Sequence, residues 1–223
     1  MNAKKLAGEK AVEQVKEGMV VGLGTGSTAY WAVQKLGELV KDGLHIKAIP
    51  TSKSTEKLAI ELNIPLVSFS EINEIDLTID GADEINPTLD LIKGGGGALL
   101  REKIVAHSSK KFVVIADESK LVNHLGSFPL PVEVTPFGLD VTKREIQNLR
   151  CNTILRQSDA SNIFITDNGN YILDCYFESI IDPSIIHTQL NMIPGVVENG
   201  LFVNMAEQVI IGYNDGRLKV LEK

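Results

Sequence analysis

The run Lys93-Gly94-Gly95-Gly96-Gly97 places one cationic side chain beside four consecutive glycines. Glycine loses more conformational freedom on folding than any other residue, so a turn alone is a poor explanation for so long a run. The glycines leave backbone N–H groups open, and Lys93 supplies a positive charge for an anionic ligand or a developing oxyanion. The run therefore predicts a functional site for an anionic substrate.

Glu102 follows in the helix that we expect over residues 98–107. At about 100° per residue, the carboxylate lies on an apolar arc formed by Ala98, Leu99, Val105 and Ala106. A carboxylate in such a place reaches out to solvent, pairs with a cation, or has a raised pKa that suits it to take a proton from carbon. The position alone leaves a structural role open.

The acidic segment Asp80-Gly81-Ala82-Asp83-Glu84 follows an apolar strand expected at residues 77–80. Ligands of open α/β sheets bind at the carboxyl ends of strands, so these acids should point into a crevice. Crowded carboxylates repel one another, which raises some of their pKa values and makes one a candidate acid. A solvated acidic turn and a divalent-metal site are the alternatives. The metal site is the weaker one, because the next segment supplies a lysine where a hard cation wants oxygens.

The segment 22–28, Gly-Leu-Gly-Thr-Gly-Ser-Thr, lies between an expected strand and an expected helix. Glycines there let the backbone approach an anion closely, and the helix amino terminus adds N–H groups. A dinucleotide fingerprint would need glycine at Ser27 and an acidic end to the next strand, and a nucleotide P-loop would need Gly-Lys-Ser or Gly-Lys-Thr. The hydroxyls of Thr25, Ser27 and Thr28 instead suit a phosphate ester or a sugar hydroxyl. A tight turn with a helix cap is the alternative.

Strands alternating with helices must position these residues, and this predicts a mainly parallel sheet covered on both faces. The expected strands are 19–23, 45–49, 66–69, 77–80, 89–92 and 112–116, and the expected helices are 3–17, 29–40, 54–62 and 98–107.

Prolines 129, 131 and 136 mark the start of a second, smaller α+β unit. Its expected elements are strand 132–134, helix 140–149, strand 153–156, a hairpin of 163–166 and 171–177, helix 183–190 and a strand near Val196. This order is ferredoxin-like. A last hairpin, 207–213 and 217–221, is expected to return to the first domain. The predicted domains are residues 1–128 with 201–223, Rossmann-like and catalytic, and residues 129–200.

The formal charge of −7 argues against nucleic acid and membrane surfaces as partners, because both are anionic. The two cysteines, Cys151 and Cys175, are too few for a disulfide scaffold, which favours a reducing, cytoplasmic compartment. The amino terminus lacks a signal-peptide core, and no apolar run is long enough for a membrane span. The four histidines have no metal-ligand spacing.

Together these segments resemble the ribose-5-phosphate isomerase A family. The resemblance spans almost the entire chain, and no position that the family uses for chemistry departs from its pattern. The matching segments are 24–28, Thr51-Ser52, 80–84, 93–98 with Arg101-Glu102-Lys103, 116–120 and 195–202.

The resemblance implies a Rossmann-like catalytic domain, a smaller α+β domain, and a homodimer or homotetramer that acts on a sugar phosphate without a cofactor. It makes Glu102 the general base of an aldose-ketose isomerase of the non-oxidative pentose phosphate pathway. The residues that it implies for substrate binding are Thr25, Gly26, Ser27, Thr28, Asp80, Gly81, Ala82, Asp83, Lys93, Gly94, Gly95, Gly96 and Lys120. Lys4 and Lys5 are further candidates for holding the phosphate.

Converting ribose 5-phosphate to ribulose 5-phosphate requires one proton to move between C2 and C1 through an enediol, and another between two oxygens. We assign the carbon-bound proton to Glu102 and stabilisation of the oxyanion to Lys93. Asp80 or Asp83 would move the oxygen-bound proton and help to open the sugar ring.

Two alternatives use related architectures, a sugar-phosphate sensor domain and an amino-sugar-phosphate deaminase. The sensor would be expected to carry a DNA-binding module. The fold is expected to begin almost at Met1, which leaves no room for one, and the charge is acidic. A coupled assay with each substrate separates the isomerase from the deaminase.

Overall fold

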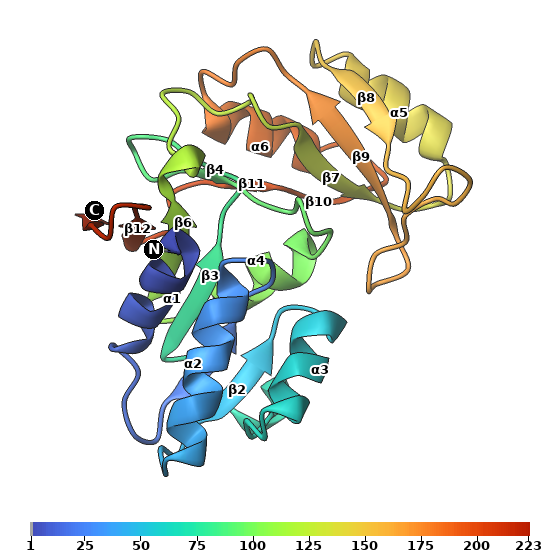
Figure 1. The fold of residues 1–223 in the computed structure, drawn as a ribbon. Coiled ribbons are helices and arrows are strands. Elements are labelled where there is room, and N and C mark those ends of the chain that lie inside the picture. Colours follow the sequence, from blue (N-terminus) through green and yellow to red (C-terminus); the bar gives the residue numbers. More distant parts are fainter. Residues whose placement is uncertain (1) are drawn as a thin grey trace. The chain divides into compact units, whose positions relative to one another are not determined.

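The structure is a computed structural model that describes residues 2–223 (Figure 1), and the chain folds into two compact units. The first unit comprises residues 2–82, 101–120 and 205–223, and the second comprises residues 83–100 and 121–204. The sequence places residues 83–100, 121–128 and 201–204 in the first domain, whereas they lie in the second unit. The short strands of residues 83–100 pair with one another and with residues 201–202.

Six strands form the sheet of the first unit, in the order β13-β12-β6-β3-β1-β2. Their bounds are β1 Val20–Leu23, β2 Lys47–Pro50, β3 Leu77–Gly81, β6 Phe112–Asp117, β12 Gln208–Gly212 and β13 Leu218–Glu222. All neighbours are parallel except β12 and β13, which form an antiparallel hairpin. The predicted Rossmann-like sheet is confirmed, and so is the return of the last hairpin to it.

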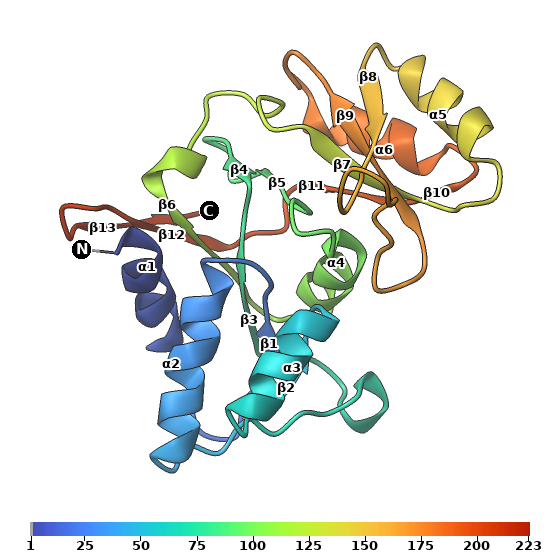
Figure 2. The same cartoon turned by 45° about the vertical axis from the view of Figure 1, so that its right-hand side comes forward.

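Helices cover both faces of this sheet. Their bounds are α1 Ala3–Val12, α2 Ala29–Lys41, α3 Lys53–Glu61 and α4 Leu99–His107. Alternate strand residues point to opposite faces, and Val21 and Leu23 join one core cluster with residues of α1, α2 and α3. Both views show α1 and α2 side by side (Figures 1 and 2). Gly22 and Thr78 face Val105 of α4 on the other side. No helix within residues 2–223 has the length and apolar character needed to cross a bilayer.

Gly22 lets α4 lie directly on the sheet. A Cβ atom at Gly22 would come within 1.9 Å of Thr78 Oγ1 and 2.6 Å of Val105 Cγ1. Gly22→Ala should therefore lower the free energy of unfolding by about 3 kcal/mol, because strand and helix would have to separate. Urea denaturation measures this. Gly81→Ala is the matched control, since a Cβ there meets no atom closer than 3.9 Å. Equal stability of the two variants would contradict close packing of α4 on Gly22.

The second unit contains an antiparallel sheet of order β10-β7-β9-β8, built from β7 Leu130–Val134, β8 Asn152–Leu155, β9 Tyr171–Tyr176 and β10 Val196–Asn199. With α5 Leu139–Gln147 and α6 Pro183–Asn191 its element order is βαββαβ, so the predicted ferredoxin-like order is confirmed. A three-stranded sheet of order β11-β5-β4 completes the unit, with bounds β4 Glu84–Ile85, β5 Leu91–Ile92 and β11 Leu201–Phe202.

Some predicted elements are wrong. The predicted strand 66–69 reduces to one bridge at Leu66, and Phe69–Glu71 is a 3-10 turn (η1) that begins at a Ser68–Glu71 capping box. Residues 163–166 form no strand, because β7 and β8 already occupy both edges of β9. The first helix ends at Val12 rather than at residue 17. The strand predicted at 89–92 is the short, antiparallel β5, preceded by Leu89 at φ 62°.

Candidate active site

Asp80 holds the glycine loop that follows β1. The parallel pairing of Leu23 with Ile79 brings Gly24 next to Asp80, where a Cβ on Gly24 would lie 2.2 Å from the Asp80 carboxylate. Asp80 is fully buried, and its Oδ1 accepts hydrogen bonds from the backbone N–H groups of Thr25 (3.0 Å) and Gly81 (2.7 Å). The close approach that the glycines permit is thus made by the protein's own carboxylate.

Thr25 ties the same loop to the start of α3. Its hydroxyl lies 2.7 Å from the hydroxyl of Thr51, 2.8 Å from that of Ser52 and 3.0 Å from that of Thr55. Ser52 also caps α3, by accepting from the N–H group of Thr55. The backbone N–H group and the hydroxyl of Thr25 both contact protein groups, so this residue fixes the loop. Gly26 and Ser27 are the exposed part of the loop.

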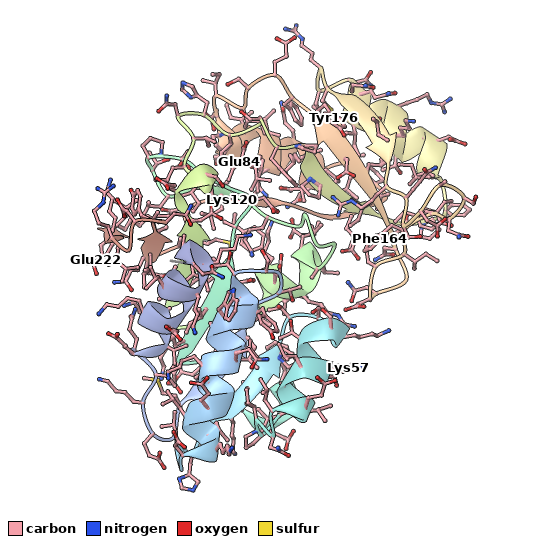
Figure 3. All side chains as sticks on the ribbon, in the orientation of Figure 1. Lys57, Glu84, Lys120, Phe164, Tyr176 and Glu222 are labelled. Atoms are coloured by element: carbon pink, nitrogen blue, oxygen red, sulfur yellow. The ribbon has the colours of Figure 1, made fainter. Side chains whose placement is uncertain are left out.

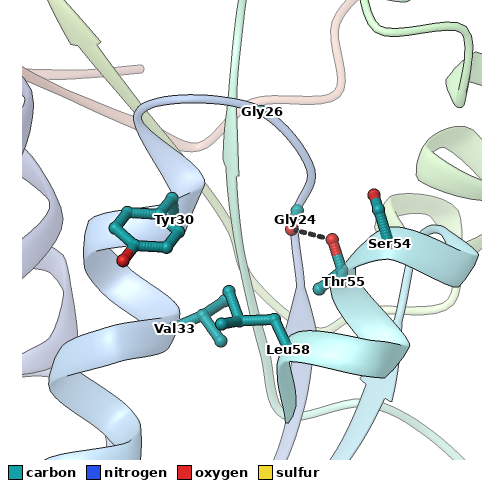
Figure 4. Close-up of a pocket in the computed structure, with 7 residues that line it drawn as sticks. All are labelled: Gly24, Gly26, Tyr30, Val33, Ser54, Thr55 and Leu58. Atoms are coloured by element: carbon teal, nitrogen blue, oxygen red, sulfur yellow. Dashed lines mark hydrogen bonds between the residues drawn. The ribbon is translucent and has the colours of Figure 1, made fainter. Parts of the chain in front are cut away.

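A cavity of about 250 Å³ lies beside the loop, between α2 and α3 (Figure 4). The Thr55 hydroxyl closes one side by donating to Gly24 O at 3.0 Å. Its lining residues are Gly24, Gly26, Tyr30, Val33, Ser54, Thr55 and Leu58.

Lys4 brings a positive charge to the exposed part of the loop. Its Nζ donates to Ser27 Oγ at 2.8 Å, directly before α2. The unpaired N–H groups of a helix amino terminus and an ammonium group together favour an anion. Lys5 is engaged elsewhere, with Glu9 and the Trp31 ring. Lys120 ends the 3-10 turn η2 (Glu118–Lys120) after β6 and is half-buried (Figure 3).

Glu102 lies on the face of the sheet toward which Asp80 points. The carboxyl end of α4 meets the start of β3, where Ile75 N donates to Ser108 O and Ser109 Oγ lies 2.7 Å from Thr78 Oγ1. The helix amino terminus, which carries Glu102, is therefore near the carboxyl edge of the sheet. Glu102 is only 5% exposed, so of the alternatives left open by the sequence, the one in which it reaches out to solvent is wrong. Lys103 is also buried, which the predicted apolar arc did not indicate.

In the second unit, the β4–β5 hairpin brings Asp83 and Lys93 together. Glu84 pairs with Ile92, and Asp83 N donates to Ile92 O at 2.8 Å, so the register places Asp83 across from Lys93. Lys93 is 2% exposed, with its Nζ 5.3 Å from the centroid of the Phe202 ring. An acid and a cation thus come from one hairpin, rather than from two parallel strand ends.

The glycine run after Lys93 forms a turn whose tip is exposed. Gly97 N donates to Gly94 O at 2.9 Å, and these two residues have φ values of 80° and 98°, which favour glycine. Gly95 and Gly96 are exposed, and Gly95 N donates to Asp83 Oδ2 at 2.7 Å. The turn therefore fixes the Asp83 carboxylate while it leaves backbone at its tip open to a ligand.

The Glu84 carboxylate binds backbone groups of the protein itself, which indicates a structural role. It is buried, and its two carboxylate oxygens accept from the backbone N–H groups of Gly126 (2.7 Å) and Phe128 (2.6 Å). Within the described residues, no three His, Cys, Asp or Glu side chains are grouped so that they could hold a metal ion.

Comparisons with known proteins identify the family of this chain. The family model of ribose 5-phosphate isomerase A (phosphoriboisomerase A) matches residues 47–216. A ribose-5-phosphate isomerase A from Bacillus mycoides (strain KBAB4) is 61% identical over 217 residues, which cover 97% of this chain and 98% of that protein. The chain belongs to the ribose 5-phosphate isomerase A family.

Solved structures of ribose-5-phosphate isomerases extend the match to the fold. The structure of ribose 5-phosphate isomerase A from Methanocaldococcus jannaschii has a TM-score of 0.93 and 44% identity, covering 99% of this chain and 98% of that one. A D-ribose-5-phosphate isomerase in complex with phospho-erythronic acid has a TM-score of 0.96 and 42% identity, with full coverage of both chains. The resemblance drawn from the sequence motifs is confirmed.

Sequence reasoning singled out the segments of the candidate site but missed several of the side chains that support them. In the first unit the structure brings Thr25 and Gly81 to Asp80, and in the second it brings Gly95 to Asp83. The hydroxyl of Thr55, 30 residues from Thr25, had not been singled out. In the sequence, Thr55 is marked only as a hydroxyl residue in the first turn of a helix after a strand. Such residues are common, so this position does not single it out.

Proposed function

We propose that this chain interconverts D-ribose 5-phosphate and D-ribulose 5-phosphate through an enediol, with Glu102 as the base. The carrying observation is Glu102 itself, a buried carboxylate at the carboxyl edge of the sheet in a chain of this family. The relative bound to phospho-erythronic acid adds support. That acid pairs a phosphate with a planar carboxylate, whose two oxygens resemble those of an enediolate.

In this mechanism the Glu102 carboxylate takes the proton from C2 of the open-chain aldose. The electron pair left behind forms the C1–C2 double bond, and the carbonyl oxygen on C1 gains negative charge and then a proton. Loss of the proton on the C2 oxygen and return of the Glu102 proton to C1 give the ketose. Lys93 stabilises the oxygen that carries the charge, and its burial strengthens that interaction because the surroundings are weakly polarisable.

We assign the oxygen-bound proton and ring opening to Asp83 rather than Asp80. Asp83 is half-exposed, and it keeps one carboxylate oxygen for substrate while the other accepts from Gly95. Asp80 is fully buried and accepts from Thr25 and Gly81. It therefore holds the loop that the substrate approaches.

The phosphate belongs, in this proposal, at the amino terminus of α2. Ser27 and the Lys4 ammonium group lie there, and they give an acidic protein a local cationic site. Lys120 remains a candidate for a sugar hydroxyl or the phosphate, and Gly26, Thr28 and Ala82 contribute backbone next to the loop and to Asp83.

The test is ribulose 5-phosphate formation by the purified wild-type protein. We expect conversion of ribose 5-phosphate at a rate that EDTA leaves unchanged, and no ammonia from a hexosamine phosphate. Ribose, which lacks the phosphate, should be converted with a kcat/KM at least about 100-fold lower, because remote binding energy is lost. Absence of turnover would contradict the function, and a strong loss in EDTA would support a metal site at the acidic segment.

We also assign the protein to the cytoplasm, within the non-oxidative pentose phosphate pathway, as a homodimer or homotetramer. Both cysteines are free and buried, which suits a reducing compartment. Phe137, Ile181 and Met192 of the second unit are 93%, 75% and 77% exposed, and burying such side chains against another copy of the chain would stabilise an oligomer. A monomer in sedimentation equilibrium at micromolar concentration would contradict the oligomer.

A further inference from the structure

Arg156 is held in one orientation directly after β8. Its backbone N–H donates to Ile172 O at 2.9 Å, and its carbonyl accepts from Phe164 N at 3.0 Å. Its guanidinium group forms a two-pronged ion pair with Asp174 of β9, Nε to Oδ2 at 2.9 Å and Nη2 to Oδ1. The two side chains are only 13% and 15% exposed, so solvent competes weakly for the pair.

The third guanidinium nitrogen of Arg156, Nη1, contacts the glycine run. Nη1 donates to Gly94 O at 2.9 Å and to Gly95 O at 3.1 Å. The N–H group of Gly95 is at the same time held by Asp83 Oδ2. Gly95 is thus held at both of its backbone groups. Arg156 binds its carbonyl, and Asp83, an acid of the proposed mechanism, binds its N–H group.

Phe164 supports the same arrangement at the far end of the run. The Arg156 guanidinium carbon lies 5.8 Å from the centroid of the Phe164 ring. A Cβ at Gly97 would come within 2.3 Å of the edge of that ring (Phe164 is labelled in Figure 3). Arg156 and Phe164 therefore contact the run at Gly94, Gly95 and Gly97, and they leave Gly96 as its open tip.

We propose that Arg156 is a positioning residue, which fixes the Gly94–Gly97 turn and through it the Asp83 carboxylate before substrate binds. Four glycines without such a hold would sample many backbone conformations, because glycine has the largest conformational entropy to lose. Fixing them in advance removes that cost from the transition state, where misplacement of a reacting group is expensive. The effect on turnover rests on the proposed isomerase function, whereas the effect on the turn does not.

Arg156→Lys separates this role from simple charge pairing. A lysine keeps the positive charge next to Asp174. Its single ammonium group cannot form a bidentate ion pair with that carboxylate and also donate to the two glycine carbonyls. Arg144→Lys, on the exposed side of α5 in the same unit, is the matched control. A purely structural Arg156 would lower the melting temperature of its variant and leave kcat of the folded protein unchanged.

Two readouts are measured at a temperature where far-UV circular dichroism shows every variant folded. In Arg156→Lys, kcat should fall by about 10-fold or more, with a smaller change in KM, because positioning acts on the transition state. Amide hydrogen exchange at Gly95, followed by NMR, should accelerate by a similar factor once its partners loosen. Arg144→Lys should leave both within about two-fold of wild type, as expected for a surface substitution.

The proposal is overturned if Arg156→Lys keeps wild-type kcat, or if Gly95 exchange is unchanged in it. If Arg156→Lys does not fold, the same two readouts are taken on Arg156→Gln, which retains an amide donor without the charge. A wild-type protein inactive on ribose 5-phosphate would contradict the proposed function. Gly95 exchange would then still decide whether Arg156 holds the turn.

Discussion

Glu102→Gln should lower kcat for ribose 5-phosphate by about 10³-fold, because the amide cannot take the proton from C2. Such a loss corresponds to a barrier higher by about 4 kcal/mol. KM should change little, since glutamine has nearly the same shape and the substrate contacts elsewhere remain. The side chain is buried, and glutamine fills nearly the same space without the charge.

The measurement is the initial rate of ribulose 5-phosphate formation, with urea denaturation of the same preparations. Glu61→Gln, an exposed position at the end of α3, is the matched control and should behave like wild type. Retention of more than about a tenth of the wild-type kcat by Glu102→Gln would remove Glu102 from the role of base.

Lys93→Met should lower kcat by about 10²-fold to 10³-fold, the loss expected when one charged stabiliser of an oxyanion is removed. Lys93 is 2% exposed and lies over the Phe202 ring, so little water is available to replace its charge. Methionine keeps the unbranched apolar stem, so the variant isolates the loss of the ammonium group.

Steady-state kinetics and thermal unfolding check this expectation. Lys57→Met removes an ammonium group from an exposed position on α3 (Figure 3) and should leave kcat unchanged. A Lys93→Met variant that is folded and as active as wild type would show that another group stabilises the oxyanion.

The sequence predicted the parallel sheet because its strands are short apolar runs between amphipathic helices, as at Val20–Leu23 before α2. It failed where local pattern and tertiary pairing disagree. Residues 163–166 are β-branched and aromatic, as in a strand, but β9 has no free edge for them. Leu91 and Ile92 are apolar enough for the large sheet, yet they pair with β4 and β11 in the second unit.

The candidate site was predictable at residues whose type is unusual for their place. Lys93 and the glycines after it, and Glu102 on an apolar arc, stand out without a structure. Arg156 does not, since an arginine at a strand end is ordinary. Its two glycine carbonyls lie 61 and 62 residues away, and only the fold brings them within reach.

The central claim, an enediol formed by Glu102, is tested most directly in D2O. Wild-type protein, incubated with ribose 5-phosphate and followed by proton NMR, should form ribulose 5-phosphate that carries deuterium at C1, because the proton on the Glu102 carboxylate exchanges with solvent. Glu102→Gln should show neither product nor exchange above the buffer rate. Deuterium incorporation by Glu102→Gln at the wild-type rate would contradict the account.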